Sequence, residues 1–243
     1  MTLPVFLVPS LPASDTFVLD GPEGRHAATV RRLRAGESLV LSDGTGSLVR
    51  CSIVAVDRDS LQLSVVERWT EPEPSPRVVL AQALIKSDRG ELAVELATEA
   101  GVDGVVPWRA SRCIAKWEAG PRGDKALARW RSTVREAAKQ ARRSRVPTVS
   151  EPVGTAGLAQ LVSQSALTLV LHESANTRLA DIELPASGDL LLVVGPEGGI
   201  TDEELTALTT AGGRAVRLGT TVLRASTAGV VALGALGALT KRW

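Results

Sequence analysis

The stretch LLLVVGPEGGITDEELTAL, Leu190–Leu208, constrains the fold most, because it passes from a strand to a helix through a glycine-rich turn. Its five leading apolar residues predict a buried strand, which Gly195 to Gly199 interrupt. Thr201, followed three residues later by Glu204, is the capping-box signature of a helix start. Glycines at the carboxyl end of a buried strand allow the backbone to approach a ligand closely. The stretch therefore predicts a βα unit that carries a candidate binding turn.

From Arg77 onward, predicted strands and helices alternate, which is typical of an α/β sheet with mainly parallel strands. The expected strands are 77–85, 104–111, 167–173, 189–195 and 214–219. The expected helices are 89–101, 126–144, 202–211 and one that begins near Ser226. This alternation predicts one α/β domain over residues 77–243.

Residues 1–69 instead have the pattern of a small antiparallel β-barrel. Two β-branched runs flank the glycine-containing turn at 43–46, which is a hairpin signal, and 61–69 begins with an alternation of apolar and polar residues. A short basic helix is expected within 21–37. The segment TEPEPSP at 70–76 has three prolines and predicts an extended linker between the two domains.

The composition, with 44% hydrophobic and 23% charged residues, is that of an ordinary globular protein. The most apolar run, 225–239, is too short to cross a bilayer, and we see no signal-peptide pattern at the start. Two histidines and two widely separated cysteines, Cys51 and Cys113, do not form a zinc-site pattern. We therefore expect a cytoplasmic protein with reduced thiols, no metal and no membrane contact.

Positive charge is concentrated in segment 122–145, which carries nine basic and two acidic residues, although the whole chain has a net charge of +1. On a helical wheel, Arg131, Arg135, Lys139 and Arg142 fall within about 80° of one another, beside an apolar stripe. Such a cationic stripe favours a helix that lies along phosphates. The alternative is an ordinary solvated face.

The turn at Gly195–Gly199 matches neither common nucleotide-binding loop. It lacks the Lys-Ser/Thr pair of a phosphate-binding loop and the spacing of a dinucleotide-binding motif. Glu197 would also repel a pyrophosphate group. The turn therefore favours a ligand that is neutral or cationic nearby, and a tight turn without any ligand is the alternative.

Four segments, taken in order, resemble one known family: ALIKSDRGELAVELATEAGV, REAAKQARRSRVPTV, LVVGPEGGITDEEL and LGTTVLRASTA. They are similar to the ribosomal RNA small-subunit methyltransferase E family, and the resemblance covers essentially the whole chain. It implies a SPOUT-type trefoil-knotted C-terminal domain, a PUA-like N-terminal barrel and a homodimer formed through the knotted domain. The implied reaction is methylation of N3 of a uridine in 16S rRNA, with S-adenosylmethionine as the cofactor.

The resemblance also implies which residues form the site. Arg224 is the catalytic candidate, because a cation can stabilise the negative charge that develops on uracil when N3 loses its proton. The expected cofactor-binding residues are Leu171, His172, Glu173, Val194, Gly195, Pro196, Glu197, Gly198, Gly199, Ile200, Leu218, Gly219, Leu223, Ser226 and Thr227. The expected RNA-binding residues are Arg25, Arg31, Arg32, Lys86, Arg89, Arg131, Arg135, Lys139, Arg142 and Arg143.

Ser226 departs from the family pattern, which commonly has a glutamate there, so the group that accepts the N3 proton is left unassigned. Two alternative functions stay open. One is a ribose 2′-O-methyltransferase with the same knotted fold. The other is an RNA-binding module without catalysis, which would use the barrel and the basic helix.

Overall fold

The structure is a computed structural model that describes residues 3–86, 88–240 and 242. The chain divides into two compact units. The first contains the chain up to Glu73 together with Ala138–Val146, and the second contains Pro74–Ala137 together with the chain from Pro147 onward. The switch at Glu73 falls within the predicted linker. The sequence contained no recognised signal that 138–146 would join the first unit.

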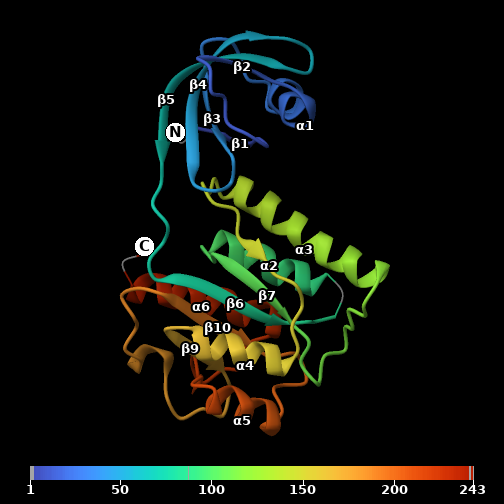
Figure 1. Cartoon of the computed structure of the whole chain (residues 1–243), viewed down its shortest axis with the longest axis vertical. Helices are drawn as coiled ribbons and strands as arrows, with labels where there is room; N and C mark the ends of the chain where they lie inside the picture. The colour runs from blue at the N-terminus through green and yellow to red at the C-terminus, as the bar shows by residue number, and fades with distance from the viewer. Residues whose placement is uncertain (1–2, 87, 241, 243) are drawn as a thin grey trace. The chain divides into compact units, whose positions relative to one another are not determined.

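The first unit contains a five-stranded sheet in the order β1-β3-β4-β5-β2 (Figure 1). Its strands are β1 (Val5–Leu7), β2 (Thr16–Leu19), β3 (Ser38–Ser42), β4 (Ser47–Val56) and β5 (Leu61–Thr70). The antiparallel prediction is confirmed for all pairs except β1 with β3, which is parallel. The predicted β3–β4 hairpin is present, and Gly44 and Gly46 have φ values of 77° and 103°, which favour glycine.

A hydrophobic core fills the first unit from one face of this sheet. Alternate residues of β4 point inward, so Val49, Cys51 and Ile53 are buried with Leu39 and Leu41 of β3. Two short helices, α1 (Gly21–Arg25) and the π-helix η1 (His26–Val30), occupy the predicted helical segment. Burial raises the pKa of the Cys51 thiol to about 11, although the Arg68 charge opposes the shift.

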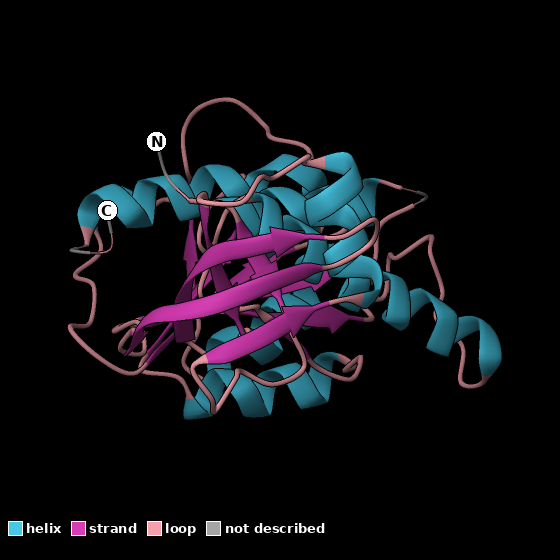
Figure 2. Ribbon diagram, turned by 90° about the horizontal axis from the view of Figure 1, so that it is seen from above, coloured by secondary structure: helices cyan, strands magenta, loops and turns pink. Residues whose placement is uncertain are grey.

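The second unit contains a six-stranded sheet in the order β11-β9-β10-β6-β7-β8, and all its strand pairs are parallel (Figures 1 and 2). Its strands are β6 (Arg77–Ala83), β7 (Gly104–Trp108), β8 (Thr148–Val149), β9 (Leu167–Leu171), β10 (Asp189–Val194) and β11 (Arg214–Val216). The predicted α/β class is confirmed. The trefoil knot stays a prediction.

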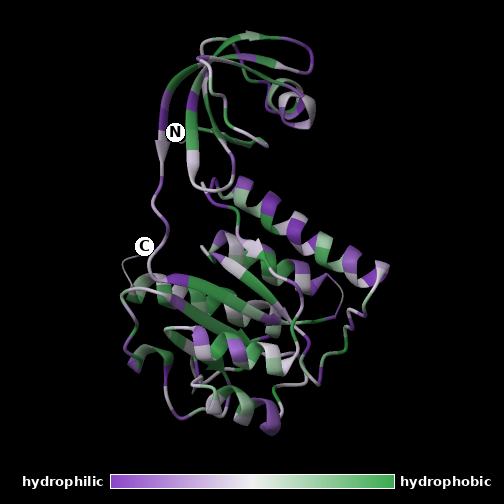
Figure 3. Ribbon diagram, in the orientation of Figure 1, coloured by the Kyte–Doolittle hydropathy of each residue, from purple (hydrophilic) through white to green (hydrophobic). Residues whose placement is uncertain are grey.

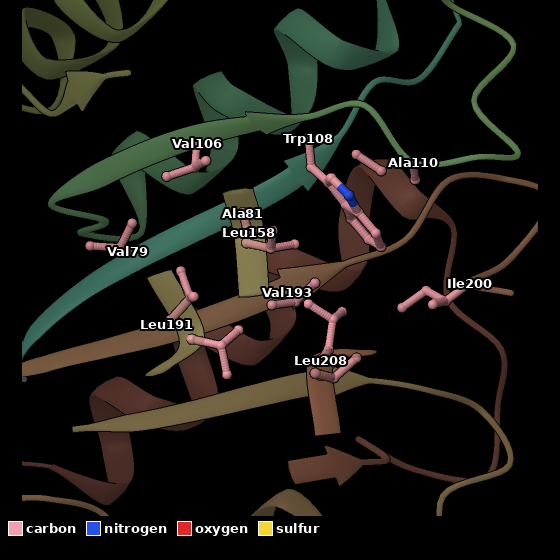
Figure 4. Packing of buried hydrophobic residues seen from close by; sticks show 13 residues of the cluster. Val79, Ala81, Val106, Trp108, Ala110, Leu158, Leu191, Val193, Ile200 and Leu208 are labelled. Atoms are coloured by element: carbon pink, nitrogen blue, oxygen red, sulfur yellow. The ribbon is translucent and has the colours of Figure 1, made fainter. Parts of the chain in front are cut away.

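Helices cover both faces of this sheet, and the strands between them are hydrophobic (Figure 3). On one face, α2 (Arg89–Glu99) packs against α6 (Ala225–Leu239), which also contacts β6 and β10. On the other face lie α4 (Thr155–Gln164) and α5 (Asp202–Thr210). Their Leu158 and Leu208 side chains join those of Ala81, Leu191 and Val193 in one buried cluster (Figure 4).

The basic helix α3 spans Pro121–Gln140 and not the predicted 126–144. Its N-terminus lies earlier because Pro121 is compatible with a first helical turn. Its C-terminus lies before Arg142, which has a left-handed φ of 56°. Arg142 is therefore outside the helix, and the predicted four-residue stripe is wrong at this position.

Three elements of the second unit, namely β8, α4 and the 3-10 helix η2 (Leu179–Asp181), were not predicted. Gly154 forms the N-cap of α4 without any side-chain cap, so the sequence contains no capping signature there. Strand β8 has only two residues, which is too short for a periodicity signal. Within the described part of the chain, no helix is long and apolar enough to cross a membrane.

A buried ion pair joins Asp103 and Arg242 within the second unit. Oδ2 of Asp103 accepts the N–H of Val78 at 2.8 Å and lies 2.9 Å from Nη2 of Arg242. The Arg242 guanidinium also donates to the carbonyl oxygens of Pro76 and Gly101. The side chains of Asp103 and Arg242 are only 7% and 13% exposed.

We predict that Asp103→Ala lowers the free energy of unfolding by about 3–5 kcal/mol, because the guanidinium would be left buried without its countercharge. Urea denaturation monitored by circular dichroism measures the change. Asp181→Ala is the matched control, because it breaks an exposed pair with Arg178 and should leave the unfolding midpoint almost unchanged. Equal stability of the two variants would contradict the prediction.

Candidate active site

A cavity of about 590 Å³ lies in the second unit, among the loops that follow β9, β10 and β11. Parallel strands bring their carboxyl ends to the same edge of a sheet, and ligands of α/β proteins bind outside that edge. The volume is within the range of pockets that bind small molecules. The edge of the sheet therefore carries the candidate site.

All the predicted cofactor-binding residues except Thr227 line this cavity. Segment 171–173 begins at the last residue of β9, and segment 194–200 begins at the last residue of β10. Segment 218–226 follows β11 and ends in the first turn of α6. Thr227 lies between the lining residues Ser226 and Ala228, and its hydroxyl donates to the carbonyl oxygen of Arg224 at 3.2 Å. The structure thus brings together three segments that are separate in the sequence.

Contacts within the protein require glycine at three positions of the turn. A Cβ on Gly195 would lie 2.7 Å from Cγ1 of Ile200, and a Cβ on Gly198 would lie 3.1 Å from Cβ of Arg112. Gly199 has a φ of +75°, which side chains rarely tolerate. The tight turn therefore has a structural cause of its own, and the same turn also lines the cavity.

Hydrogen bonds hold this turn from two neighbouring loops. The backbone N–H of Lys86 donates to Oε1 of Glu197 at 3.1 Å. From the loop that follows β7, Nη1 of Arg112 donates to the carbonyl oxygen of Gly198 at 2.9 Å. Within the turn, the N–H of Gly199 donates to the carbonyl oxygen of Pro196 at 2.9 Å. The conformation of the turn is therefore fixed by contacts from outside it as well as within it.

The predicted capping box at the start of α5 is confirmed: Oγ1 of Thr201 accepts the N–H of Glu204 and Oε2 of Glu204 accepts the N–H of Thr201, each at 3.2 Å. The other carboxylate oxygen of Glu204 accepts the N–H of Ser111 at 2.8 Å, and the hydroxyls of Ser111 and Thr155 at 3.0 Å each. Burial of Glu204 opposes its charge, but these hydrogen bonds outweigh burial and hold its pKa below the usual value.

Arg224 lines the cavity as the N-cap of α6, and it is exposed. Ser226 also lines the cavity and is only 3% exposed. Among the described residues, the charged side chains that line the cavity are four arginines and two glutamates. They are Arg89, Arg112, Arg217, Arg224, Glu173 and Glu197. This excess of positive charge favours an anionic substrate at the mouth of the cavity.

Arg112 and Arg217 belong to the cavity lining although the sequence analysis did not select them. Arg112 follows β7 in a loop without a recognisable motif, and Arg217 directly follows β11. Only the packing of the loops shows that either residue reaches the cavity. The arginine content of these two loops was the one weak signal in the sequence.

The predicted RNA-binding residues are divided between the two units. Arg89, the first residue of α2, lines the cavity, and Lys86 lies between β6 and α2. In the first unit, Arg25, Arg31 and Arg32 are exposed at or just beyond the two short helices. The remaining predicted residues are in or after α3, namely Arg131, Arg135, Lys139, Arg142 and Arg143.

The cationic stripe of α3 has acidic partners within the chain. Nη2 of Arg131 lies 2.9 Å from Oε1 of Glu151 in the second unit. Nζ of Lys139 lies 2.7 Å from Oε1 of Glu23, within the first unit, and both side chains are largely buried. Two cations of the predicted stripe are therefore paired with carboxylates of the chain itself, and RNA binding by the stripe stays a prediction.

The fold and the site define an α/β protein with a ligand cavity at the carboxyl edge of a parallel sheet. Residues 71–237 match the family model described as an RNA methyltransferase domain. Residues 19–66 match the model of the RNA methyltransferase PUA domain. These matches place both units within the class of RNA methyltransferases.

Individual relatives narrow this class. The chain is 53% identical to ribosomal RNA small subunit methyltransferase E of Mycobacterium bovis, over all of this chain and 94% of the relative. It is 30% identical to the protein of that name from Bacillus subtilis, over 91% of this chain and 89% of the relative. A crystal structure of the Neisseria gonorrhoeae protein bound to S-adenosylmethionine has a TM-score of 0.83 and 28% identity, covering 98% of each chain.

The chain belongs to the ribosomal RNA small subunit methyltransferase E family. The predicted family and the predicted PUA-like N-terminal domain are thereby confirmed.

Proposed function

We propose that this protein transfers a methyl group from S-adenosylmethionine to N3 of a uridine in 16S rRNA of the small ribosomal subunit. The observation that carries the proposal is the cavity built by segments 171–173, 194–200 and 218–226 in a chain of this family. In support, the similar Neisseria gonorrhoeae structure contains S-adenosylmethionine. We further propose residues 1–69 as an RNA-binding domain, 70–76 as a linker and 77–243 as the catalytic domain.

The cavity lining has the chemistry that S-adenosylmethionine requires. Val194, Ile200 and Leu223 supply apolar surface for the adenosine, and the backbone of the loops supplies donors and acceptors. Gly219 lines the cavity, and no atom lies within 4 Å of the position that its Cβ would take. A bound ligand can therefore use this space.

The space at Gly219 gives a direct test of cofactor binding. We predict that Gly219→Val lowers the affinity for S-adenosylmethionine at least about tenfold, because the added side chain extends from a Cβ position that lies in open space on the cavity lining. Calorimetric titration measures the affinity, and the thermal unfolding midpoint should change little.

Gly154→Val is the matched control, because Gly154, like Gly219, has open space at its Cβ position, but it does not line the cavity. It should bind S-adenosylmethionine like the original protein. If both variants bind equally well, the cofactor does not occupy the space beside Gly219.

When bound, S-adenosylmethionine supplies an already electrophilic methyl group, so the residues of this chain have to align the reactants and stabilise charge. We propose Arg224 for the second task, because it is an exposed guanidinium on the cavity lining. Loss of the N3 proton spreads negative charge to the uracil oxygens, and a positioned cation lowers the energy of that state.

We predict that Arg224→Ala reduces methyl transfer at least about a hundredfold while the affinity for S-adenosylmethionine changes less than about threefold. Arg224→Lys should recover part of the rate, because it keeps the charge and loses the guanidinium geometry. Transfer of a labelled methyl group to 16S rRNA and calorimetric titration measure the two quantities. Equal loss of transfer and cofactor binding would instead make Arg224 a residue that shapes the cavity.

RNA binding by the remaining cations is a proposal of the same kind. Arg89 lies at the cavity, and Arg25, Arg31 and Arg32 are exposed on the first unit, so we propose these four as phosphate contacts. For the cations of α3 and the segment after it, and for Lys86, we keep the RNA-binding assignment as a proposal. The intramolecular pairs of Arg131 and Lys139 would then compete with phosphate.

We also propose that the protein is a cytoplasmic homodimer with a trefoil-knotted second domain. Leu92 of α2 and Val231 of α6 are exposed apolar side chains on two helices that pack together, and they support the proposed dimer. Both cysteines are free, which is consistent with a reducing compartment.

Nucleoside mass spectrometry of 16S rRNA tests the reaction most sharply. RNA from cells with the gene should contain an N3-methylated uridine that is absent after deletion and returns on complementation. Complementation with Arg224→Ala should not restore it. Loss of a ribose-methylated nucleoside instead would support the 2′-O alternative, and an unchanged RNA with no binding of S-adenosylmethionine would support the non-catalytic alternative.

A further inference from the structure

Glu204 has a buried carboxylate that accepts hydrogen bonds from three parts of the second unit. It is 4% exposed, and it lies in the first turn of α5, directly after the glycine turn. Besides its own capping box, it accepts hydrogen bonds from Ser111 in the loop after β7 and from Thr155 in the first turn of α4. Trp108 at the end of β7 donates its indole N–H to the same Thr155 hydroxyl at 3.4 Å.

The residue next to Ser111 connects this carboxylate to the cavity. Arg112 places its Cβ against Gly198, where an added methyl group would lie at 3.1 Å, and donates from Nη1 to the carbonyl oxygen of Gly198 at 2.9 Å. Both Arg112 and Gly198 line the cavity. An unbroken path of short contacts therefore runs from the Glu204 carboxylate, through the Ser111 backbone and Arg112, to the turn.

We propose that Glu204 is a positioning residue for the methyl-donor site and that it acts through Arg112. The hydrogen bond from the N–H of Ser111 to the carboxylate fixes the backbone position of the next residue, Arg112. The Arg112 side chain then holds the Gly198 carbonyl in the conformation that shapes the cavity. The inference rests on the proposed function, because the ligand of the cavity is taken to be S-adenosylmethionine.

The alternative role for Glu204 is purely structural, as the cap of α5. The two roles differ in how they combine with a change at Arg112. A capping role weakens α5 whether or not Arg112 is present, so its effect would multiply with that of Arg112→Ala. A role that acts through Arg112 leaves nothing further to lose once the guanidinium has been removed.

The test is a double-mutant cycle of Glu204→Gln and Arg112→Ala, with the affinity for S-adenosylmethionine measured by calorimetry. The amide of glutamine keeps the size of the side chain, but it removes the charge and one of the two acceptor oxygens. We expect each single variant to bind about tenfold more weakly, and the double variant also about tenfold more weakly instead of about a hundredfold. The titrations are carried out at a temperature at which circular dichroism shows all variants to be folded.

Arg109→Ala provides the matched control cycle. Arg109 is an exposed arginine three residues before Arg112, and it donates to the carbonyl oxygen of Pro152 without lining the cavity. On its own it should leave binding unchanged, and in combination with Glu204→Gln it should leave the effect of that substitution unchanged. If Glu204→Gln does not fold, Glu204→Asp, whose shorter side chain withdraws the carboxylate from the N–H of Ser111, takes its place in both cycles.

Multiplicative effects in the Arg112 cycle, or unchanged affinity in the single variants, would overturn the inference. Absence of S-adenosylmethionine binding by the original protein would instead overturn the proposed function. The two failures are therefore distinguishable in the same set of titrations.

Discussion

The parallel pairing of β6, β9, β10 and β11 is the constraint on which the site depends. Because these strands run in one direction, their carboxyl ends meet at one edge, and the loops that leave β9, β10 and β11 must share the space outside it. The apolar residues of β6 and β10 are buried on both faces of the sheet, where helices cover them. Because a shift in register would move these residues out of the core, packing fixes the strand register and with it the position of this edge.

Strands alone do not determine the shape of a loop. In this protein, close contacts at glycines and hydrogen bonds to a buried carboxylate fix the shape of the turn after β10. The turn after β10 is compact because its glycines permit contacts with Ile200 and Arg112 that a side chain would prevent. The carboxylate of Glu204 has four hydrogen-bond donors around it, which offset the cost of burying its charge. A cavity with such a preorganised wall can bind a ligand without first ordering a loop.

Features encoded locally were predictable, and features that depend on tertiary contacts were not. The β3–β4 hairpin, the capping box of Thr201 and Glu204, and the alternation of strands and helices follow from neighbouring residues. The cavity lining by 171–173, 194–200 and 218–226 was predicted through family resemblance and not through physical patterns. Arg112 was missed because its role depends on a contact with Gly198, 86 residues away. The pairing of Lys139 with Glu23 was missed for the same reason, because the sequence does not reveal that 138–146 joins the first unit.

A crystal structure of this protein grown with S-adenosylmethionine tests the central claim most directly. The account predicts density for the cofactor between the turn at 195–200 and the segment 218–226, with the sulfonium methyl group open to the surface that carries Arg224. Density for the cofactor at another place on the protein, or an unchanged empty cavity at saturating concentration, would contradict it.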